Sequence, residues 1–412
     1  MDRALMPYSI LIRLAWRNLW RNYRRTLIML GAIAVGVWAM IFITAVLRGM
    51  VDDMVRTAVL NLPGHVQIHN PGYRNDPSIA NSMPPPGQPV LDGLKRSDIV
   101  NWSARVRVPA VITSEYGTRG TTLVGIDPAA EYGLSFVPDS IVEGHFLESV
   151  DDNGLIVGRK LIENLETSAG HRVVVVSQDP ENEIIDRGFR IVGVFSAKLE
   201  HVEEAFIFTG RNVAQAMLNM GQAISEIAIM GKNYRDVTGI LEIRRVAGKD
   251  VEVLPWYELD TYTGTMLATM DGFVLVWIIV VFLALSFGLV NTLIMAVFER
   301  VREIGLMQAL GMWPSMILFQ VLLETFFMLM VGLVAGNVLA VASIAVLGNG
   351  IDLSSVSDAM QIMGIANVLY PSLQLVDVLL ADIVVTVLGL LAGLLPAWRA
   401  SRYQPAAAIA EF

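Results

Sequence analysis

Four charged residues stand close together in the segment FERVREIGLMQALGMWPSM, which covers 298–316. They are Glu299, Arg300, Arg302 and Glu303, and an apolar helical face follows them, made of Ile304, Leu306, Met307 and Leu310. Gly311 and Pro314 then end the helix. A short amphipathic helix that carries charges at its start predicts a docking point for a protein partner. An ordinary helical turn is the alternative.

Residues for catalysis or metal binding are sparse. The chain has five histidines and no cysteine. His65 and His69 would share one face of a strand, but a third metal ligand is not evident. The phosphate-binding pattern G-x-x-x-x-G-K-[ST] does not occur, because Asn233 and Asp250 follow the two Gly-Lys pairs. We therefore expect neither an enzyme nor a cofactor or metal bound by this chain.

Four long apolar runs must position the charged segment. They cover about 26–47, 272–297, 316–347 and 378–396, and each has the ~20 residues that cross a bilayer as a helix. Apolar residues make up 54% of the chain and charged residues 17%. The sequence thus predicts a membrane protein with a large domain inserted after its first span. The first run has no cleavage site after it, so we expect a retained signal anchor.

Charge predicts the orientation of the spans. Arginines precede the first run, lie between the second and third runs, and follow the fourth. The connection 348–377 has no lysine or arginine and contains Asp352, Asp358 and Asp377. Because lysine and arginine bias short loops to the cytoplasm, both termini and the segment 299–315 should be inside. The inserted domain should be outside.

The inserted domain, 49–271, should be α+β with two lobes. Short β-branched runs predict strands at 65–69, 108–113, 121–126, 154–158, 172–177, 189–195, 204–209, 224–230 and 251–255. Helices are expected at 159–168, 211–220 and 234–246, and a proline-rich surface loop at 70–93. The domain carries 30 acidic and 19 basic side chains, which excludes the basic face that nucleic-acid binding needs.

The N-terminal segment 8–25 is amphipathic at helical spacing. Arg13, Arg17, Arg21 and Arg24 form one stripe, and Ile12, Trp16, Leu19, Trp20 and Tyr23 lie on the other side. This pattern predicts a helix in the membrane interface, with tryptophans at headgroup depth. A plain positively charged flank is the alternative.

Several stretches together resemble one known family. ERVREIGLMQALG (299–311), with Gln320 and Glu324 in the next span, is similar to the coupling segment of MacB- and LolC/LolE-type (FtsX-like) ABC transporter permeases. LLPAWRASRYQPAAAIAEF (394–412), LRGMVDDMVRTAVLNLPGHVQI (47–68) and GLIVGRKLIENLETSAGHRVVVV (154–176) resemble further parts of that family, in the same order along the chain. The layout is closest to the lipoprotein-releasing permeases.

The resemblance implies a division of the chain and a set of partners. The fold would be a membrane all-α bundle of four transmembrane helices with an inserted MacB-like α+β periplasmic domain. Such permeases work with a second copy or paralogue and with a cytoplasmic ABC ATPase dimer, which binds ATP and Mg. The expected parts are an interfacial helix at 1–25, spans at 26–48, 272–298, 316–347 and 378–396, the periplasmic domain 49–271, the coupling helix 299–315, a periplasmic loop 348–377 and a cytoplasmic tail 397–412.

The residues expected to couple to the ATPase follow from the same resemblance. They are Glu299, Arg300, Arg302, Glu303, Ile304, Gly305, Leu306, Ala309, Leu310 and Gly311. The first span would continue as a helix into the outer domain. Because the chain has no ATP-binding motif, the ATPase is expected to be a separate subunit in the bacterial inner membrane complex.

The loop 177–188 occupies the place at which one lipoprotein-releasing permease recruits its soluble carrier. Here the loop is short and acidic, with Asp179, Glu181, Glu183 and Asp186. These residues are candidates for binding a periplasmic carrier or adaptor. A solvated hairpin is the alternative, and it is favoured because the loop departs from the carrier-binding type.

Large flexible apolar residues near the outer ends of the first two spans are candidates for a substrate cavity, since methionine adapts to varied shapes. They are Trp38, Met40, Phe42, Met50, Met54, Met266, Met270, Phe273 and Trp277. Lipid contact and helix packing are the alternative. Glu324 and Asp382 lie within apolar runs, where we expect structural roles, and Gly332/Gly336 and Gly389/Gly393 permit close helix contact.

The sequence thus predicts a permease subunit that extracts or releases an amphiphilic substrate, with lipoprotein as the leading candidate. Export of small molecules or peptides with an adaptor is an alternative. A mechanotransmitting or signalling permease that transports nothing is another.

Overall fold

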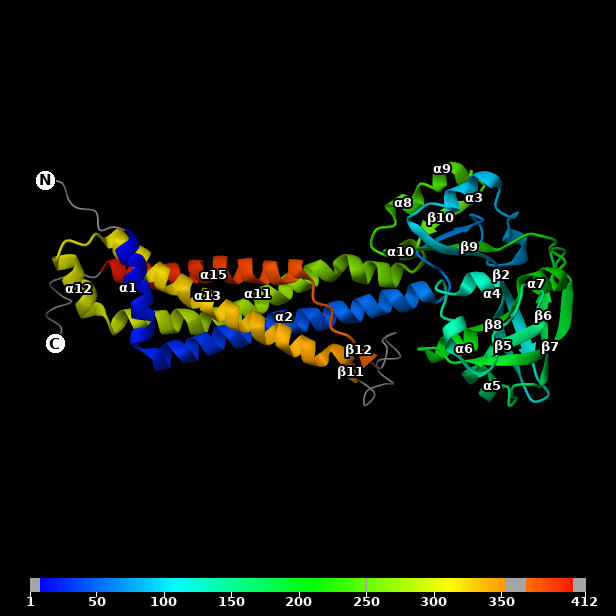
Figure 1. The fold of residues 1–412 in the computed structure, drawn as a ribbon, viewed down its shortest axis with the longest axis horizontal. Helices are drawn as coiled ribbons and strands as arrows, with labels where there is room; N and C mark the ends of the chain where they lie inside the picture. The colour runs from blue at the N-terminus through cyan, green and yellow to red at the C-terminus, as the bar shows by residue number, and fades with distance from the viewer. Residues whose placement is uncertain (1–7, 249, 353–367, 403–412) are drawn as a thin grey trace. The chain divides into compact units, whose positions relative to one another are not determined.

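The computed structural model describes residues 8–248, 250–352 and 368–402 (Figure 1). The chain forms two compact units. Unit 1 comprises Met1–Asp52, Ala268–Asp352 and Val368–Phe412, and its described part is a helical bundle. Unit 2 comprises Asp53–Leu267 and Leu353–Asn367, and its described part is an α+β domain. The predicted fold class is confirmed.

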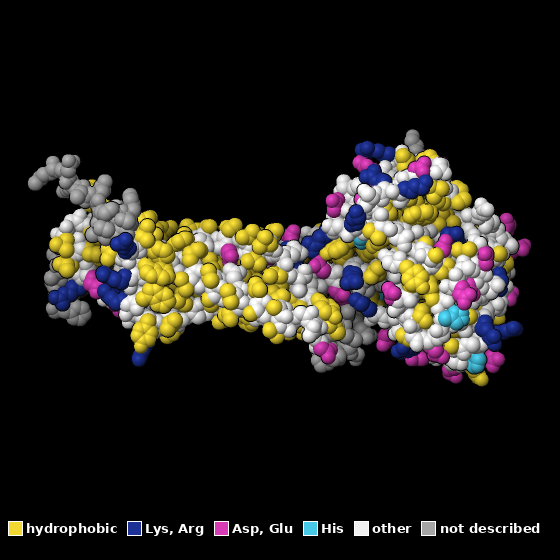
Figure 2. All heavy atoms as spheres, in the orientation of Figure 1, with side chains coloured by type: hydrophobic (Ala, Val, Ile, Leu, Met, Phe, Trp, Pro, Cys, Tyr) yellow, Lys and Arg dark blue, Asp and Glu magenta, His cyan; other side chains and the backbone are white. Residues whose placement is uncertain are grey.

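In the part of the chain that the structure describes, four helices are long and apolar enough to cross a membrane. They are α2 (Tyr23–Leu60), α11 (Thr261–Phe298), α13 (Pro314–Val346) and α15 (Leu375–Ser401). Apolar side chains cover the surface of the bundle along these spans (Figure 2). α2 and α11 have 38 residues each and exceed the ~20 that a span requires. Their bounds therefore differ from the predicted spans 26–48 and 272–298.

The extra length of α2 lies beyond Arg48, where no proline interrupts the helix. The resemblance implied that the first span continues as a helix, and the structure confirms it. α11 likewise begins before its apolar run, where Asp260 accepts hydrogen bonds from the backbone and hydroxyl of Thr263.

The glycine pairs allow the spans to pack closely. A Cβ on Gly336 of α13 would lie 2.8 Å from the Ala34 carbonyl oxygen of α2, and Gly332 faces Ile33 in the same way. On α15, Gly389 and Gly393 face α13 at Leu329 and Thr325, respectively. The predicted role of these glycines in helix contact is confirmed.

Two shorter helices lie at one end of the bundle, α1 (Tyr8–Arg21) and α12 (Val301–Ala309). α1 buries Leu11, Ala15 and Leu19 and packs on α13, with Trp16 edge-on to Phe327. The predicted apolar side is thus divided: Leu19 is buried, whereas Ile12, Trp16, Trp20 and Tyr23 are exposed, as are the arginines of the opposite stripe. A short 3₁₀ turn (Leu347–Asn349) and two paired strands complete the described part of unit 1, β11 (Ile351–Asp352) and β12 (Val368–Leu369).

Unit 2 is built on a sheet with the strand order β10-β1-β9-β2-β3-β8-β5-β7-β4, in which β6 also pairs with β2 and β7. The strands are β1 (Val66–His69), β2 (Ile99–Thr113), β3 (Thr118–Ile126), β4 (Ile141–Gly144), β5 (Gly154–Gly158), β6 (Arg172–Gln178), β7 (Ile184–Phe195), β8 (Phe206–Gly210), β9 (Glu226–Gly231) and β10 (Glu252–Pro255).

The long strand β2 joins the two predicted lobes. Its first half pairs with β9 and its second half with β3 and β6. One apolar core lies under β1, β9 and β10, and the others lie under the remaining strands. The sequence predicted only the second half, because the first half alternates polar and apolar residues whose polar side looks solvent-exposed.

Short helices cover the sheet, and several depart from expectation. They are α3 (Gln88–Leu94), α4 (Pro128–Glu131), α5 (Arg159–Asn164), α6 (Glu200–Ala205), α7 (Arg211–Met217), α8 (Thr238–Leu241), α9 (Arg244–Ala247) and α10 (Trp256–Leu259), with 3₁₀ turns at Ile79–Asn81 and Pro138–Ser140. The single helix expected at 234–246 is the pair α8 and α9. The segment 70–93 is no loose connector, since Tyr73, Ile79 and Met83 are buried.

Candidate functional site

The charges that precede α12 are largely used inside the bundle. Arg300 donates to both carboxylate oxygens of Glu324 on α13, at 3.0 and 3.2 Å, and to the Asn18 carbonyl of α1 at 2.8 Å. The Asn18 amide donates to the same Glu324 carboxylate at 2.8 Å. These three residues therefore connect the coupling segment, α1 and α13.

Two further ion pairs reach the N-terminal helices. Arg21 pairs with Glu303 at 2.8 Å, and Arg25 pairs with Glu299 at 2.5 Å. The hydrogen bond that Arg21 donates to Glu303 raises the pKa of Arg21 above its usual value, and slight burial opposes the shift. Both side chains of the Arg21–Glu303 pair are about half exposed, so this pair contributes at most about 1 kcal/mol.

The other side of α12 faces away from the bundle. Arg302, Leu306, Ala309 and Leu310 are exposed, as is Gly311 beyond the helix, and Leu310 is 80% exposed. Ile304 and Gly305 are buried, and Ile304 lies in an apolar cluster with Val297 and Ile317. The predicted coupling set therefore divides in two. Glu299, Arg300 and Glu303 pair within unit 1, while Arg302 and the exposed apolar residues remain accessible.

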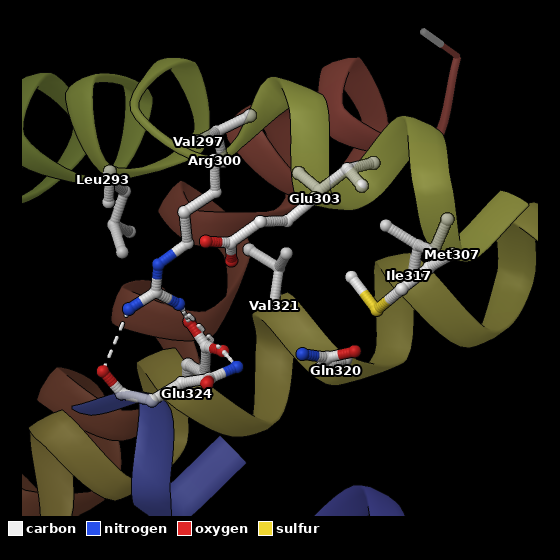
Figure 3. A pocket seen from close by; sticks show the side chains of 12 residues that line it. Leu293, Val297, Arg300, Glu303, Met307, Ile317, Gln320, Val321 and Glu324 are labelled. Atoms are coloured by element: carbon white, nitrogen blue, oxygen red, sulfur yellow. Dashed lines mark hydrogen bonds and ion pairs between the residues drawn. The ribbon is translucent and has the colours of Figure 1, made fainter. Parts of the chain in front are cut away.

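A small hollow that is partly open to solvent lies beside these ion pairs (Figure 3). α11, α12 and α13 line most of it, and Arg300 and Glu324 stand at one side. Gln320 projects into it, and the side-chain oxygen of this buried residue has no hydrogen-bond partner. The sequence singled out Gln320 only through the resemblance and gave no sign of a cavity.

The opposite end of the bundle has a cluster that the sequence did not predict. Arg48 of α2 makes two hydrogen bonds to Asp377 of α15, at 2.8 and 2.9 Å, and one to Asp271 of α11 at 2.5 Å. Arg48 and Asp377 are buried, whereas the Asp271 side chain is 81% exposed. The sequence signals for this cluster were Arg48, directly after the first apolar run, and Asp377, directly before the fourth.

The segment 370–372, which precedes α15, also crosses α2 closely at this end of the bundle. The backbone NH of Ser372 donates to the Ala45 carbonyl at 2.8 Å, and a Cβ on Gly49 would lie 2.0 Å from the Tyr370 carbonyl oxygen. Residue 49 must therefore be glycine if Tyr370 is to keep this position. Together with Arg48, these contacts hold α2 against the start of α15.

The predicted substrate-cavity residues do not share one exposed surface. Met40, Met54 and Met270 are buried, and Met50, Met266 and Trp277 are partly buried. Trp38 donates to the Ser343 hydroxyl of α13 at 3.0 Å and stacks on Phe42, which are packing contacts. Phe273 is 65% exposed. Most of this set thus serves helix packing in the structure described.

The second intramembrane carboxylate is also paired. The Asn337 amide of α13 donates to Asp382 of α15 at 3.0 Å. This contact joins two spans, as the structural interpretation of Asp382 predicted, and the partners of Glu324 agree with the structural interpretation of that residue.

In unit 2, a buried ion cluster fixes the end of α2. Arg105 of β2 donates to Glu131 at 2.7 and 2.8 Å and also donates to the Leu62 carbonyl. Burial alone would lower the pKa of Arg105, but the charge and hydrogen bonds of Glu131 outweigh it, so the pKa is raised. Arg105 and Glu226, which is 3.6 Å away, are also buried. This pairing explains why the polar side of β2 is inside the domain.

The acidic loop between β6 and β7 is a closed hairpin. Asp179 is buried, and its carboxylate accepts the backbone NH groups of Glu181 and Glu183 at 3.0 and 2.9 Å. Asp179 is therefore engaged in forming the turn. The side chains of Glu181, Glu183 and Asp186 are exposed.

The histidines have structural surroundings. His65 is buried, and its Nδ1 accepts the Gly231 NH at 2.9 Å, while burial lowers its pKa to about 4. The ring is therefore neutral at neutral pH. His69 Nδ1 lies 2.9 Å from the Asn70 carbonyl. Within residues 8–248, 250–352 and 368–402, no three histidine or acidic side chains converge as metal ligands would.

Two family models match the chain. Residues 275–405 match the FtsX-like permease C-terminal model, and residues 26–252 match the MacB-like periplasmic core domain. The lipoprotein-releasing system transmembrane protein LolC of Neisseria meningitidis is 25% identical over 403 residues, which cover 93% of each chain.

Other relatives match part of their own length. The pyoverdine export ATP-binding/permease protein PvdT of Pseudomonas fluorescens is 23% identical, and the match spans 97% of this chain and 59% of that protein. The macrolide export ATP-binding/permease protein MacB of Bordetella avium is 33% identical over 154 residues, which are 37% of this chain and 20% of that one. Among solved structures, the periplasmic region of MacB from Actinobacillus actinomycetemcomitans is similar with a TM-score of 0.35 and 13% identity, covering 49% of this chain and 93% of that one.

Proposed function

Because the chain belongs to the ABC transporter permeases that combine a MacB-like periplasmic core domain with an FtsX-like C-terminal part, we propose that it couples ATP hydrolysis in a separate ATPase subunit to motion of its outer domain. The substrate is an amphiphile taken from the outer leaflet of the inner membrane, and a lipoprotein is the leading candidate. ATP and Mg bind to the partner ATPase dimer, and a second permease copy or paralogue completes the complex.

The two-sided character of α12 is the observation that carries the proposal. Its inner charges are paired with α1 and α13, whereas Leu306 and Leu310 are exposed beside Arg302. Exposed apolar side chains on a helix that ion pairs hold in place can dock in an apolar groove of the ATPase. A push on α12 then reaches α1 and α13 through the Arg21–Glu303 and Arg300–Glu324 pairs.

The charge distribution supports the orientation that this mechanism needs. Arginines concentrate around α1 and α12, which favours a cytoplasmic position for this end of the bundle by the positive-inside rule. α2 extends as one helix from Tyr23 to Leu60 and would transmit motion along its axis. The Arg105 cluster then fixes the end of that helix within the outer domain.

Two relatives support two substrate classes. The LolC relative matches along nearly its whole length and belongs to a lipoprotein-releasing system, as its name states. The PvdT relatives are named for pyoverdine export, which favours small-molecule export as the second candidate. Recruitment of a carrier through the 177–188 hairpin is the weaker part of the proposal, because Asp179 is engaged in the turn.

A docking experiment tests the central claim. We expect Leu310→Asp, alone or with Leu306→Asp, to abolish co-purification of the ATPase from membranes. An aspartate at either position cannot be buried in an apolar groove. Ile184→Asp is a matched control, since Ile184 is 76% exposed on the hairpin of unit 2. Full retention of the ATPase by the Leu306/Leu310 double variant would contradict the docking face.

A second measurement separates the substrates. The complex in liposomes is offered a triacylated lipoprotein or a soluble siderophore, and ATP hydrolysis is measured. Stimulation by the lipoprotein alone supports release, and stimulation by the siderophore with an adaptor supports export.

A further inference from the structure

Gln320 has a buried hydrogen-bonding atom that the protein leaves unused. The residue is 6% exposed, and its side-chain oxygen has no hydrogen-bond partner among the described residues. An unsatisfied buried acceptor costs roughly 1–3 kcal/mol. Figure 3 shows the Gln320 amide projecting into the hollow, with its nitrogen on the side of Glu324 and its oxygen pointing away from it. A donor that enters the hollow would relieve this cost.

The hollow offers hydrogen-bond acceptors, whereas the cations beside it are already engaged. Arg300, Glu303 and Glu324 line it, and Glu303 pairs with Arg21 while Glu324 pairs with Arg300. Arg300 already donates to Glu324 and to the Asn18 carbonyl. A ligand that brings its own positively charged N–H donors is therefore favoured over an anion.

The remaining wall is apolar and lies at the ends of two spans. Leu293 and Val297 come from the last turns of α11, and Ile317 and Val321 from the first turns of α13. Gln320 is six residues into α13, which is about 9 Å along a helix that rises 1.5 Å per residue. Gln320 thus lies near one end of a candidate span, and the ends of spans lie near the headgroup region of a bilayer.

We propose that this hollow binds a primary ammonium group attached to a hydrocarbon chain, as an aminophospholipid headgroup presents it. The ammonium donates to the Gln320 side-chain oxygen and lies beside the carboxylates of Glu303 and Glu324, each of which also has one guanidinium partner. Its hydrocarbon lies against Leu293 and Val297. Because the hollow is bounded by both α12 and α13, the bound headgroup stiffens the coupling segment. This lipid binding is a property beyond the proposed coupling to the ATPase, and it does not require the ATPase.

Lipid retention tests the site directly. The full chain is placed in nanodiscs that contain equal amounts of phosphatidylethanolamine and phosphatidylcholine with the same acyl chains, and retained lipids are measured by native mass spectrometry. Phosphatidylcholine has no N–H donor. We expect at least about a tenfold preference for phosphatidylethanolamine, since a hydrogen bond to a charged group exceeds the free energy of one tenfold step.

Variants identify the atom responsible. Gln320→Met keeps the size of the side chain and removes the acceptor, so the preference should fall to about equal retention. Gln320→Glu keeps an acceptor and should keep the preference. Gln308→Met makes the same change at a glutamine that does not line the hollow and should behave as the wild type. In nanodiscs of phosphatidylcholine alone, Gln320→Met should keep one cooperative thermal transition, which shows that it folds.

Competition distinguishes the source of the ammonium. If free ethanolamine displaces the retained phosphatidylethanolamine, the site accepts a soluble amine, and if it does not, the lipid anchor is required. Both results support an ammonium site. Equal retention of the two lipids by the wild type, or an unchanged preference in Gln320→Met, would leave only water in the hollow and overturn the proposal.

Discussion

The two ends of the helical bundle are held by ion pairs of opposite character. At the coupling end, formed by α1, α12 and the first turns of α13, the Arg21–Glu303 pair is half exposed and Arg300–Glu324 is only partly buried. At the distal end, formed by residues 45–49, 271 and 370–377, Arg48 and Asp377 are almost fully buried. Exposed pairs rearrange at little cost, whereas a buried pair strongly resists separation. The coupling end thus suits an element that responds to a partner, and the distal end suits a joint.

The largest effect should come from breaking the distal joint. Arg48→Met leaves Asp377 buried without its cation, and removing one partner of a buried pair costs about 3–5 kcal/mol. We expect a loss of this size in the free energy of unfolding, measured by denaturant titration in detergent. The double variant Arg48→Met/Asp377→Leu replaces both partners by apolar groups and should recover most of the loss. A double variant no more stable than Arg48→Met would contradict the buried-pair account.

A smaller effect is expected from the partly buried pair at the coupling end. Glu324→Gln removes the negative charge but keeps an oxygen for the Asn18 amide, so we expect a loss of about 1–3 kcal/mol. Hydrogen exchange of the α1 backbone should also become faster, because Glu324 links α1 to α13. Unchanged exchange in α1 would show that apolar packing alone holds this helix.

The exposed pair of the coupling end should matter still less. Arg21→Gln is expected to cost at most about 1 kcal/mol, since both partners are half exposed. The difference from wild type should vanish near 1 M salt, where the screening length is about 3 Å. Denaturant titration of the wild type and Arg21→Gln at low and high salt measures this difference in unfolding free energy. A salt-independent loss as large as that of Arg48→Met would remove the contrast between the two ends.

The smallest effect separates the two carboxylates of the distal end. Asp271 is 81% exposed although it contacts the same arginine as buried Asp377. Asp271→Asn should therefore change the unfolding free energy by less than about 1 kcal/mol. Asp377→Asn should cost clearly more. Equal losses in the two variants would mean that burial does not decide the strength of this cluster.

The sequence predicted the elements better than their contacts. The apolar runs gave four spans, because ~20 consecutive apolar residues have no other stable arrangement in a bilayer. Helix ends were less well predicted: α2 continues to Leu60 because nothing after Arg48 stops it. The first half of β2 was missed because its buried Arg105 satisfies its charge with Glu131, a partner 26 residues away in the chain.

The candidate site shows the same division. The pattern of the segment 299–311 predicted a docking helix, and the family resemblance implied a coupling role, but neither indicated the partners of Glu299, Arg300 and Glu303. In the structure they pair with Arg25, Glu324 and Arg21, respectively. The substrate-cavity set stays a prediction, because methionine and tryptophan suit packing as well as substrate binding, and Trp38 makes a packing contact with Ser343.

By itself, the sequence determined that the protein has four long apolar spans, an inserted α+β domain and a short amphipathic helix between its second and third spans. Those features depend on composition and on short-range periodicity. Each can be read from a single segment of the chain, without knowledge of its contacts. Tertiary structure decided which charges are free, which are paired, and where Gln320 is left without a donor. These properties depend on residues hundreds of positions apart, such as Arg48 and Asp377, and only the packed helices bring them together.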